Sequence, residues 1–254
     1  MPVKIIDLSV PLRTDPNKVI QARIEYQTHE QGAQSLGPLF GINPADLPEG
    51  KFEAVETVTA VTHAGTHLDA PYHYWPTSGG QPARTIDKVP LEWCYGDGVV
   101  LDMTHKKRGE LITLEDVTAA LKKIGYKIKP WDIVLIRTDT TTKHYYERGY
   151  ENMHAGMSAE ATHWLVDRGV KVMGIDAWGF DRPFDDMVAE FKKGNKEQFW
   201  AAHWVGREKE YLHIENLINL DKIPRPFGFK VAAFPISIEN GSAGWVRAVA
   251  IIEE

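Results

Sequence analysis

Three histidines and one aspartate lie within eleven residues of this chain, at His63, His67, Asp69 and His73. The chain has ten histidines in 254 residues, so a window of this size holds well under one histidine on average. Imidazole and carboxylate together are a ligand set that suits Zn²⁺, Mn²⁺ or Fe²⁺. The cluster therefore predicts a divalent metal site, and the alternative is a histidine-rich surface loop or a set of hydrogen-bonded core histidines.

The spacing of the cluster requires a bend between its first two histidines. In an extended strand His63 and His67 would be about 13 Å apart at ~3.3 Å per residue, which is the limit for two imidazoles that share one ion. Gly65 permits the chain to tighten between them, and a single helical turn would serve equally well. His67 and Asp69 need no bend, because alternate residues of an extended chain share a face.

The run from His63 to His73 fills every fixed position of the pattern His-x-Gly-Thr-His-x-Asp-x-Pro-x-His. In this it resembles the metal-dependent cyclase family, which includes bacterial kynurenine formamidase and isatin hydrolase. The likeness extends from Ile6-Asp7-Leu8-Ser9 to the last strands. It implies an α/β fold of the swivelling β/α/β type, with residues 1–254 as a single cyclase-like hydrolase domain. It also implies a homodimer or a larger homo-oligomer.

The resemblance implies two metal ions per subunit, zinc or manganese. By resemblance, His63, His67 and Asp69 hold one ion. Asp69, His203 and Glu215 hold the second, and the carboxylates bridge the two. His203 and Glu215 stand twelve residues apart, which is the spacing of the family's C-terminal ligand pair.

His73 corresponds to the family's proton-transfer residue, while His213 is a nearby alternative to His203 as a ligand. A bound divalent ion activates water and polarises a carbonyl group. An imidazole with a pKa near 6.5 can move the proton. These features predict a hydrolase acting on C–N bonds, like an arylformamidase or a cyclic amide hydrolase. Its substrate would be a small amide, N-formyl amide, cyclic amide or lactone.

Two other functions stay open at this point. One is a non-catalytic protein that binds a small molecule and holds a structural metal, which a closed four-ligand site with His73 turned away would favour. The other is a dehydratase or cyclase on the same metal platform. The sequence names no substrate-binding residue. Formamidase-like members share an early tryptophan, but the first one here is Trp75, so we expect N-formylkynurenine to be a poor substrate.

Composition limits the partners and the compartment. The 29 Lys and Arg residues against 35 Asp and Glu residues give a net charge of −6, which argues against nucleic acid or an anionic membrane as the main partner. The single cysteine, Cys94, excludes an intrachain disulfide and a thiolate metal cage, and we expect it to be a packed thiol. We expect no signal peptide, no membrane helix and a cytoplasmic location.

Hydrophobic patterning predicts alternating strands and helices. The predicted strands cover residues 3–10 (an edge strand), 52–62, 98–103, 131–137 and 170–175. Helices are predicted from Thr113, which has Asp116 as its capping-box partner, to Gly125, and from Ser158 to Gly169. Residues 185–223 are predicted to be helical, residues 13–50 irregular, and residues 229–238 and 245–252 a terminal β-hairpin. This order is typical of α/β crossovers.

Overall fold

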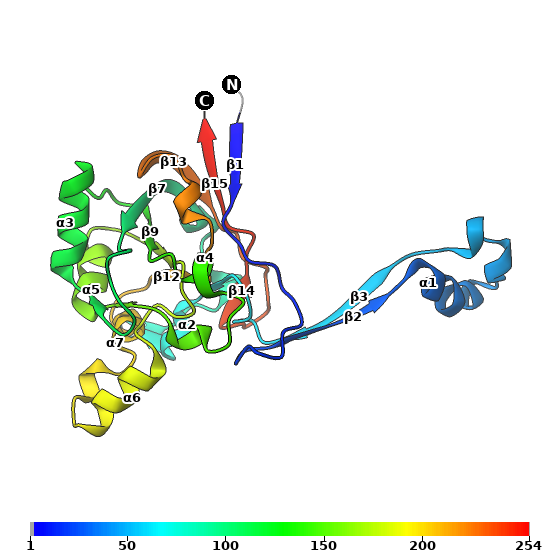
Figure 1. Cartoon of the computed structure of the whole chain (residues 1–254), viewed down its shortest axis with the longest axis horizontal. Coiled ribbons are helices and arrows are strands. Elements are labelled where there is room, and N and C mark those ends of the chain that lie inside the picture. The colour runs from blue at the N-terminus through cyan, green and yellow to red at the C-terminus, as the bar shows by residue number, and fades with distance from the viewer. Residues whose placement is uncertain (1–2, 254) are drawn as a thin grey trace. The chain divides into compact units, whose positions relative to one another are not determined.

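The computed structural model describes residues 3–253 and alternates strands with helices along the chain (Figure 1). The strands are β1 (Val3–Asp7), β2 (Ala22–Gln27), β3 (Val55–Ala60), β4 (His67–Asp69), β5 (Thr77–Ser78), β6 (Gln81–Pro82), β7 (Tyr95–Asp102), β8 (Leu111–Ile112), β9 (Ile133–Arg137), β10 (Gly156–Met157), β11 (Val172–Ile175), β12 (Leu212–Glu215), β13 (Phe227–Ala232), β14 (Ala243–Trp245) and β15 (Val249–Glu253). The helices are α1 (His29–Leu36), α2 (Pro71–Tyr74), α3 (Leu114–Ile124), α4 (Thr140–His144), α5 (Ala159–Asp167), α6 (Phe184–Lys192) and α7 (Ala201–Trp204).

The main sheet has nine strands in the order β1-β15-β13-β7-β9-β11-β12-β4-β14. Its centre, β7-β9-β11-β12, is parallel, because helices connect these strands. The strands on both sides of this centre pair in antiparallel fashion. The predicted α/β class is therefore confirmed, and β1 is an edge strand as predicted.

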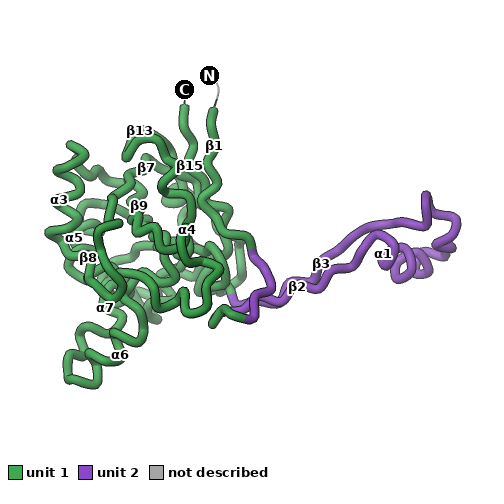
Figure 2. The backbone as a smooth tube through the Cα atoms, viewed as in Figure 1, with its two compact units in different colours: residues 1–11, 17–19, 62–254 green, residues 12–16, 20–61 purple. Residues whose placement is uncertain are grey.

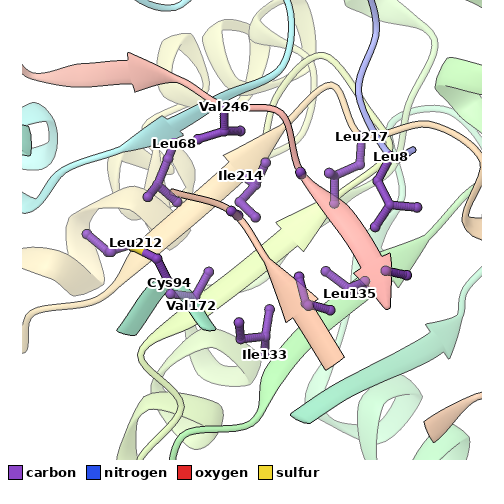
Figure 3. Close-up of a cluster of buried hydrophobic side chains, with 14 of the residues drawn as sticks. Leu8, Leu68, Cys94, Ile133, Leu135, Val172, Leu212, Ile214, Leu217 and Val246 are labelled. Carbon is purple, nitrogen blue, oxygen red and sulfur yellow. The ribbon is translucent and has the colours of Figure 1, made fainter. Parts of the chain in front are cut away.

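A hydrophobic core fills one face of this sheet (Figure 3). Leu68 of β4 and Leu212 and Ile214 of β12 are fully buried in it, and so is the Cys94 thiol, as predicted. Burial raises the pKa of Cys94 to about 12. Because strand side chains alternate between faces, the neighbours of Leu68 and Ile214 point to the opposite face. A second apolar cluster covers that face together with α3, α5 and α7.

The two helices with the clearest sequence signals begin and end where predicted. Thr113 and Asp116 form a reciprocal capping box at the start of α3. Gly125 ends that helix in the left-handed conformation, at φ 67°. Ser158 caps α5 by accepting a hydrogen bond from the backbone of Ala161. Within residues 3–253, no helix combines the length and the apolar character needed to cross a membrane.

The prediction of helix across 185–223 is wrong for its last part. Helices α6 and α7 lie in this range, but residues 212–215 form strand β12. Two apolar residues alternate there with two polar ones, which is the strand period, and the segment lies between two partner strands. The terminal strands β13 and β15 do pair in antiparallel fashion. The segment that connects them contains a further strand, β14, which pairs with β4.

Residues 12–16 and 20–61 form the second of the two compact units into which the chain divides (Figure 2). Here β2 and β3 form an antiparallel ribbon, and Thr28 and Gln31 form a capping box at the start of α1. The prediction that 13–50 is irregular is therefore wrong for β2 and α1, whose local signals are short and lie among prolines and glycines. The prediction of one domain over 1–254 stays a prediction.

Candidate metal centre

Two neighbouring strands bring four ligating side chains together. Strands β4 and β12 pair so that His67 lies opposite Glu215 and Asp69 lies opposite His213. All four residues are buried. Directly opposed residues of an antiparallel pair have Cβ atoms about 5 Å apart, so their side chains converge on one place.

Asp69 lies at the centre of this group. Its Oδ1 atom is 2.9 Å from His63 Nδ1 and 3.3 Å from His67 Nε2, and its Oδ2 atom is 2.9 Å from His213 Nε2. Within residues 3–253, neither carboxylate oxygen has a hydrogen-bond partner of acceptable geometry, and neither do His67 Nε2 and His213 Nε2. Buried polar atoms are rarely left unpaired, so these atoms are placed as a cation would require.

The C-terminal residues complete the group. Glu215 Oε2 lies 3.6 Å from His67 Nε2, while its Oε1 atom lies 3.3 Å from His213 Nε2 and 3.8 Å from His203 Nε2. His203 Nε2 also lies 4.0 Å from Asp69 Oδ2. The donor atoms of Asp69, His203, His213 and Glu215 all lie within 4.8 Å of one another. The structure thus brings both His203 and its alternative, His213, to the site.

The first histidine reaches the site through a turn. Gly65 has φ 66°, so the chain bends there as predicted. The rings of His63 and His67 have centroids 5.0 Å apart. Each ring is also fixed by its other nitrogen, because His67 Nδ1 lies 2.9 Å from the Gly65 carbonyl and His63 Nε2 lies 3.1 Å from Ser242 Oγ. Such contacts orient a metal-binding imidazole.

His73 differs from the other histidines in its access to solvent. It lies on α2, its side chain is 24% exposed, and its Nε2 atom is 3.9 Å from Asp69 Oδ2. Burial lowers its pKa, and His203 and His63 add to this effect although Asp69 opposes it, so the pKa falls to about 4. The ring is therefore neutral at pH 7, and its pKa lies well below the value near 6.5 that the sequence led us to expect. His63, Asp69 and His73 form a second group of donor atoms within 4.8 Å of one another.

The buried groups carry charge even without a metal. Burial raises the pKa of Asp69 and Glu215, but the surrounding histidines outweigh it, so the Asp69 pKa lies well below its ordinary value and that of Glu215 falls to about 2. Burial lowers the pKa of His213, but its contacts with Asp69 and Glu215 raise it to about 9. Two ionised carboxylates therefore lie among buried imidazoles, and this arrangement attracts a cation.

The family model named Cyclase matches residues 6–182 of this chain, which is more than half of its length and includes the whole histidine cluster. The chain belongs to the cyclase family. The later residues His203, His213 and Glu215 lie outside the matched range, so their place in the site comes from the structure.

Two curated cyclase-family relatives and one solved structure extend this result. The chain is 27% identical to cyclase-like protein 1 of Arabidopsis thaliana over 152 residues, which is 59% of this chain and about half (56%) of that relative. It is 27% identical to kynurenine formamidase of Paracidovorax citrulli over 252 residues, 98% of this chain and 96% of that protein. Isatin hydrolase A from Ralstonia solanacearum shares the fold, with a TM-score of 0.78 at 24% identity over 99% of this chain and 92% of that chain. The predicted cyclase-like swivelling β/α/β fold is confirmed.

Sequence reasoning missed several residues around this cyclase-family site. Tyr74 and Phe180 both stack on His213, with ring centroids 5.1 and 4.5 Å away. Trp200 stacks on His203 at 4.3 Å and meets the His73 ring edge-on at 5.2 Å. A signal was available for part of this set, because His213-Ile-Glu215 repeats the His-x-acid spacing of His67-Leu-Asp69. The aromatic residues and Asp181 carry no such signal.

Proposed function

We propose that this protein is a metal-dependent hydrolase of small amides, N-formyl amides, cyclic amides or lactones. The observation that carries the proposal is the buried carboxylate of Asp69, whose two oxygens lack hydrogen-bond partners within residues 3–253 and face imidazole nitrogens on both sides. A divalent ion bound there would activate water and polarise the substrate carbonyl. The kynurenine formamidase relative, similar over nearly the whole chain, supports the same reaction class.

The side chains around Asp69 divide the work of the reaction. Asp69 and Glu215 supply ligand atoms together with four histidines, which are His63, His67, His203 and His213. His73 transfers the proton. The ring is neutral at pH 7, so its lone pair can accept a proton from the attacking water and pass it to the leaving nitrogen or oxygen. Its pKa of about 4 makes it a weak base and a strong acid, which favours the second of these two transfers. The Trp200 ring meets the His73 ring edge-on, with centroids 5.2 Å apart, and is an apolar neighbour of this proton-transfer group.

We propose zinc or manganese as the metal, with two ions per subunit. Donor atoms face both oxygens of Asp69: His63 and His67 on one side, and His203 and His213 on the other. Glu215 likewise points one oxygen toward His67 and the other toward His203 and His213. Carboxylates that present both oxygens in this way are suited to bridge two ions.

The first experiment measures metal and activity together. The purified protein is reconstituted with Zn²⁺ or Mn²⁺, and its metal content is measured by elemental analysis. It is then tested on a panel of N-formyl, cyclic amide, lactone and phosphate ester substrates. We expect bound metal, hydrolysis of at least one amide or lactone, and loss of activity with a chelator. N-formylkynurenine is expected to be a poor member of the panel, because the early tryptophan is absent.

Three results would contradict the proposal. Less than about 0.1 metal ion per chain after reconstitution would rule out the metal site, since a structural or catalytic ion binds a folded site tightly. A fully metallated protein that binds panel compounds without turning them over would favour the small-molecule binding protein instead. Preferred cleavage of the phosphate ester would exclude the amide hydrolase.

We further propose that the enzyme acts as a homodimer or larger homo-oligomer. The second unit supports an oligomer, because a two-stranded ribbon alone is at best marginally stable and needs a surface to pack against. Several of its large apolar side chains are exposed, among them Tyr26 (69%), Leu39 (74%) and Phe40 (68%). Exposed apolar patches of this kind mark interaction surfaces, and a second copy of the chain is the partner we propose.

A further inference from the structure

We propose that Asp181 is a positioning residue for His203, and this rests on the proposed function. Asp181 is not one of the metal ligands. Its carboxylate fixes the orientation and the tautomer of the His203 ring, so that the Nε2 lone pair faces the metal site. The same short loop also holds Glu215, so one segment aligns both ligands of the C-terminal part.

Asp181 is buried in the loop between β11 and α6, with 4% of its surface exposed. Its Oδ1 atom accepts a hydrogen bond from the Ala202 backbone N–H at 2.8 Å. Its Oδ2 atom accepts one from the His203 backbone N–H at 3.1 Å. Both donors lie at the start of α7, so the carboxylate holds the helix that carries His203.

The same Oδ2 atom also contacts the His203 ring, at 2.5 Å from Nδ1. A carboxylate only accepts hydrogen bonds, so Nδ1 must carry the hydrogen, and in the neutral ring Nε2 then carries the lone pair. That lone pair lies on the side of Asp69 and Glu215. Trp200 stacks on the ring with an interplanar angle of 17°, which limits its tilt. A carboxylate behind a ligating imidazole is a common means of orienting a metal ligand.

The residue before Asp181 acts on the other ligand. The Phe180 backbone N–H donates to Glu215 Oε1 at 2.8 Å. The Asp181 carbonyl accepts from Nε2 of the buried His154 at 3.1 Å, which anchors the loop from outside the site. A displacement of Phe180 and Asp181 would therefore move both Glu215 and His203.

The competing explanation is that Asp181 only caps α7, and three variants separate the two roles. Asp181→Ala removes both the helix contacts and the ring contact. Asp181→Asn keeps one oxygen, which can accept from the backbone N–H and Nδ1–H of His203, and gives up the bond from Ala202. Tyr211→Phe is the matched control, because the Tyr211 hydroxyl donates to the Ala202 carbonyl at 2.8 Å and supports the same helix without touching the ring.

Two measurements are made on each variant. The first is the tautomer of His203 in the metal-free protein, read at pH 8 from long-range ¹⁵N–¹H NMR correlations. The second is Zn²⁺ affinity, by competition with a chromophoric chelator. For Asp181→Ala we expect loss of the Nδ1–H tautomer and Zn²⁺ binding weaker by about 10–100-fold, the usual effect of losing such a partner. Asp181→Asn and Tyr211→Phe are expected to keep the tautomer and to bind Zn²⁺ nearly as the wild type does.

The outcomes are distinct. If Asp181→Ala keeps the Nδ1–H tautomer and wild-type affinity, the proposal is wrong. If all three variants weaken Zn²⁺ binding equally, Asp181 only supports the helix, and the proposal is again wrong. If Asp181→Ala does not fold, Asp181→Ser replaces it, because a hydroxyl still offers an acceptor and is too short to bond the ring. The NMR readout needs no turnover, so a tautomer change in a protein that hydrolyses no amide supports the role of Asp181 and contradicts the proposed function.

Discussion

His67 and His73 belong to the same eleven-residue motif but have different surroundings. His67 Nε2 is buried between the carboxylates of Asp69 and Glu215, at 3.3 and 3.6 Å. His73 is partly exposed, and its nearest carboxylate oxygen is 3.9 Å away. The first position is that of a ligand. The second is open to a substrate and suits proton transfer.

Substitution of these two histidines should therefore have different effects. We expect His67→Ala to lose metal, because it removes a buried ligand atom. His73→Ala should keep its metal and lose turnover by about 10²–10⁴-fold, the usual contribution of a general acid or base. Elemental analysis and kcat on the same preparations test both expectations. If His73→Ala is empty while His67→Ala is filled, the two roles are reversed.

The charges at His213 make the site sensitive to pH. Its pKa is raised to about 9 in the metal-free protein, against an ordinary value of 6.5. The stabilisation from its contacts with Asp69 and Glu215 is thus fully present below pH 6.5 and is lost as the pH rises through 9. We expect the melting temperature of the chelator-treated protein to fall between pH 6.5 and 9, and His213→Gln to flatten this fall.

The same proton affects metal binding with the opposite sign. A protonated His213 leaves a positive charge beside Asp69, so a cation must displace that proton. Zn²⁺ affinity should therefore increase with pH over this range, with release of protons on binding. Calorimetry in buffers of different ionisation enthalpy measures the number released. A proton count of zero at pH 7.5 would show that His213 is already neutral.

At the scale of elements, the sequence indicated the part of the site on residues 63–69 but predicted a helix where residues 212–215 form a strand. His63, His67 and Asp69 are close in the chain, so spacing alone indicates a shared site. Glu215 joins them only because β12 lies beside β4, and that pairing depends on strand order, which no local pattern encodes. Residues 212–215 were predicted to be helical because a four-residue strand is too short to outweigh the helical signals before it.

The capping box of α3 is a local feature that the sequence did predict, and its contribution can be measured. Thr113 Oγ1 accepts from the Asp116 N–H at 3.3 Å, and the Asp116 carboxylate accepts from the Thr113 N–H at 2.8 Å. We expect Thr113→Ala to reduce the free energy of unfolding by about 1 kcal/mol. The melting temperature should fall by about 2–4 °C, with unchanged metal content. Thr118→Ala, on the exposed side of the same helix, is the control and should cost nothing.

Acid should remove the same cap. Burial raises the pKa of Asp116, but Lys106 and Thr113 outweigh it and lower the pKa to about 2, from 3.8. The stabilisation from this carboxylate is therefore present above pH 3.8 and is lost as the pH falls toward 2. The melting-temperature difference between wild type and Thr113→Ala should shrink over that range. A constant difference would assign the cap to the threonine hydroxyl alone.

At the scale of the whole molecule, the exposed apolar residues of the second unit test the proposed oligomer. Leu39→Ser with Phe40→Ser should convert the oligomer to a monomer in size-exclusion chromatography with light scattering, because both side chains are mostly exposed in one chain. Leu91→Ser is the control, since Leu91 is 58% exposed and lies in the first unit. A wild-type monomer, or a double variant that stays oligomeric, would contradict the proposal.

Other whole-molecule predictions came from the family resemblance and from composition, and they have different outcomes. The resemblance to the cyclase family, read from one motif, is confirmed, because a long pattern with many fixed positions is specific. The cytoplasmic location, the oligomer and the single domain stay predictions. A net charge of −6 argues against some classes of binding partner for this protein but does not identify the actual partner.

Strand β4, which carries His67 and Asp69, has β12 and β14 as its two neighbours in the sheet. Both neighbours come from residues 212–245, so on the ribosome β4 emerges long before either strand exists. At roughly 5–20 residues per second, translation takes on the order of ten seconds to reach β12. During that time His63, His67, Asp69 and His73 lie on an unpaired segment, and His213 and Glu215 have not yet been made. The complete centre therefore forms only near the end of synthesis, and a chain released before residue 212 cannot assemble it.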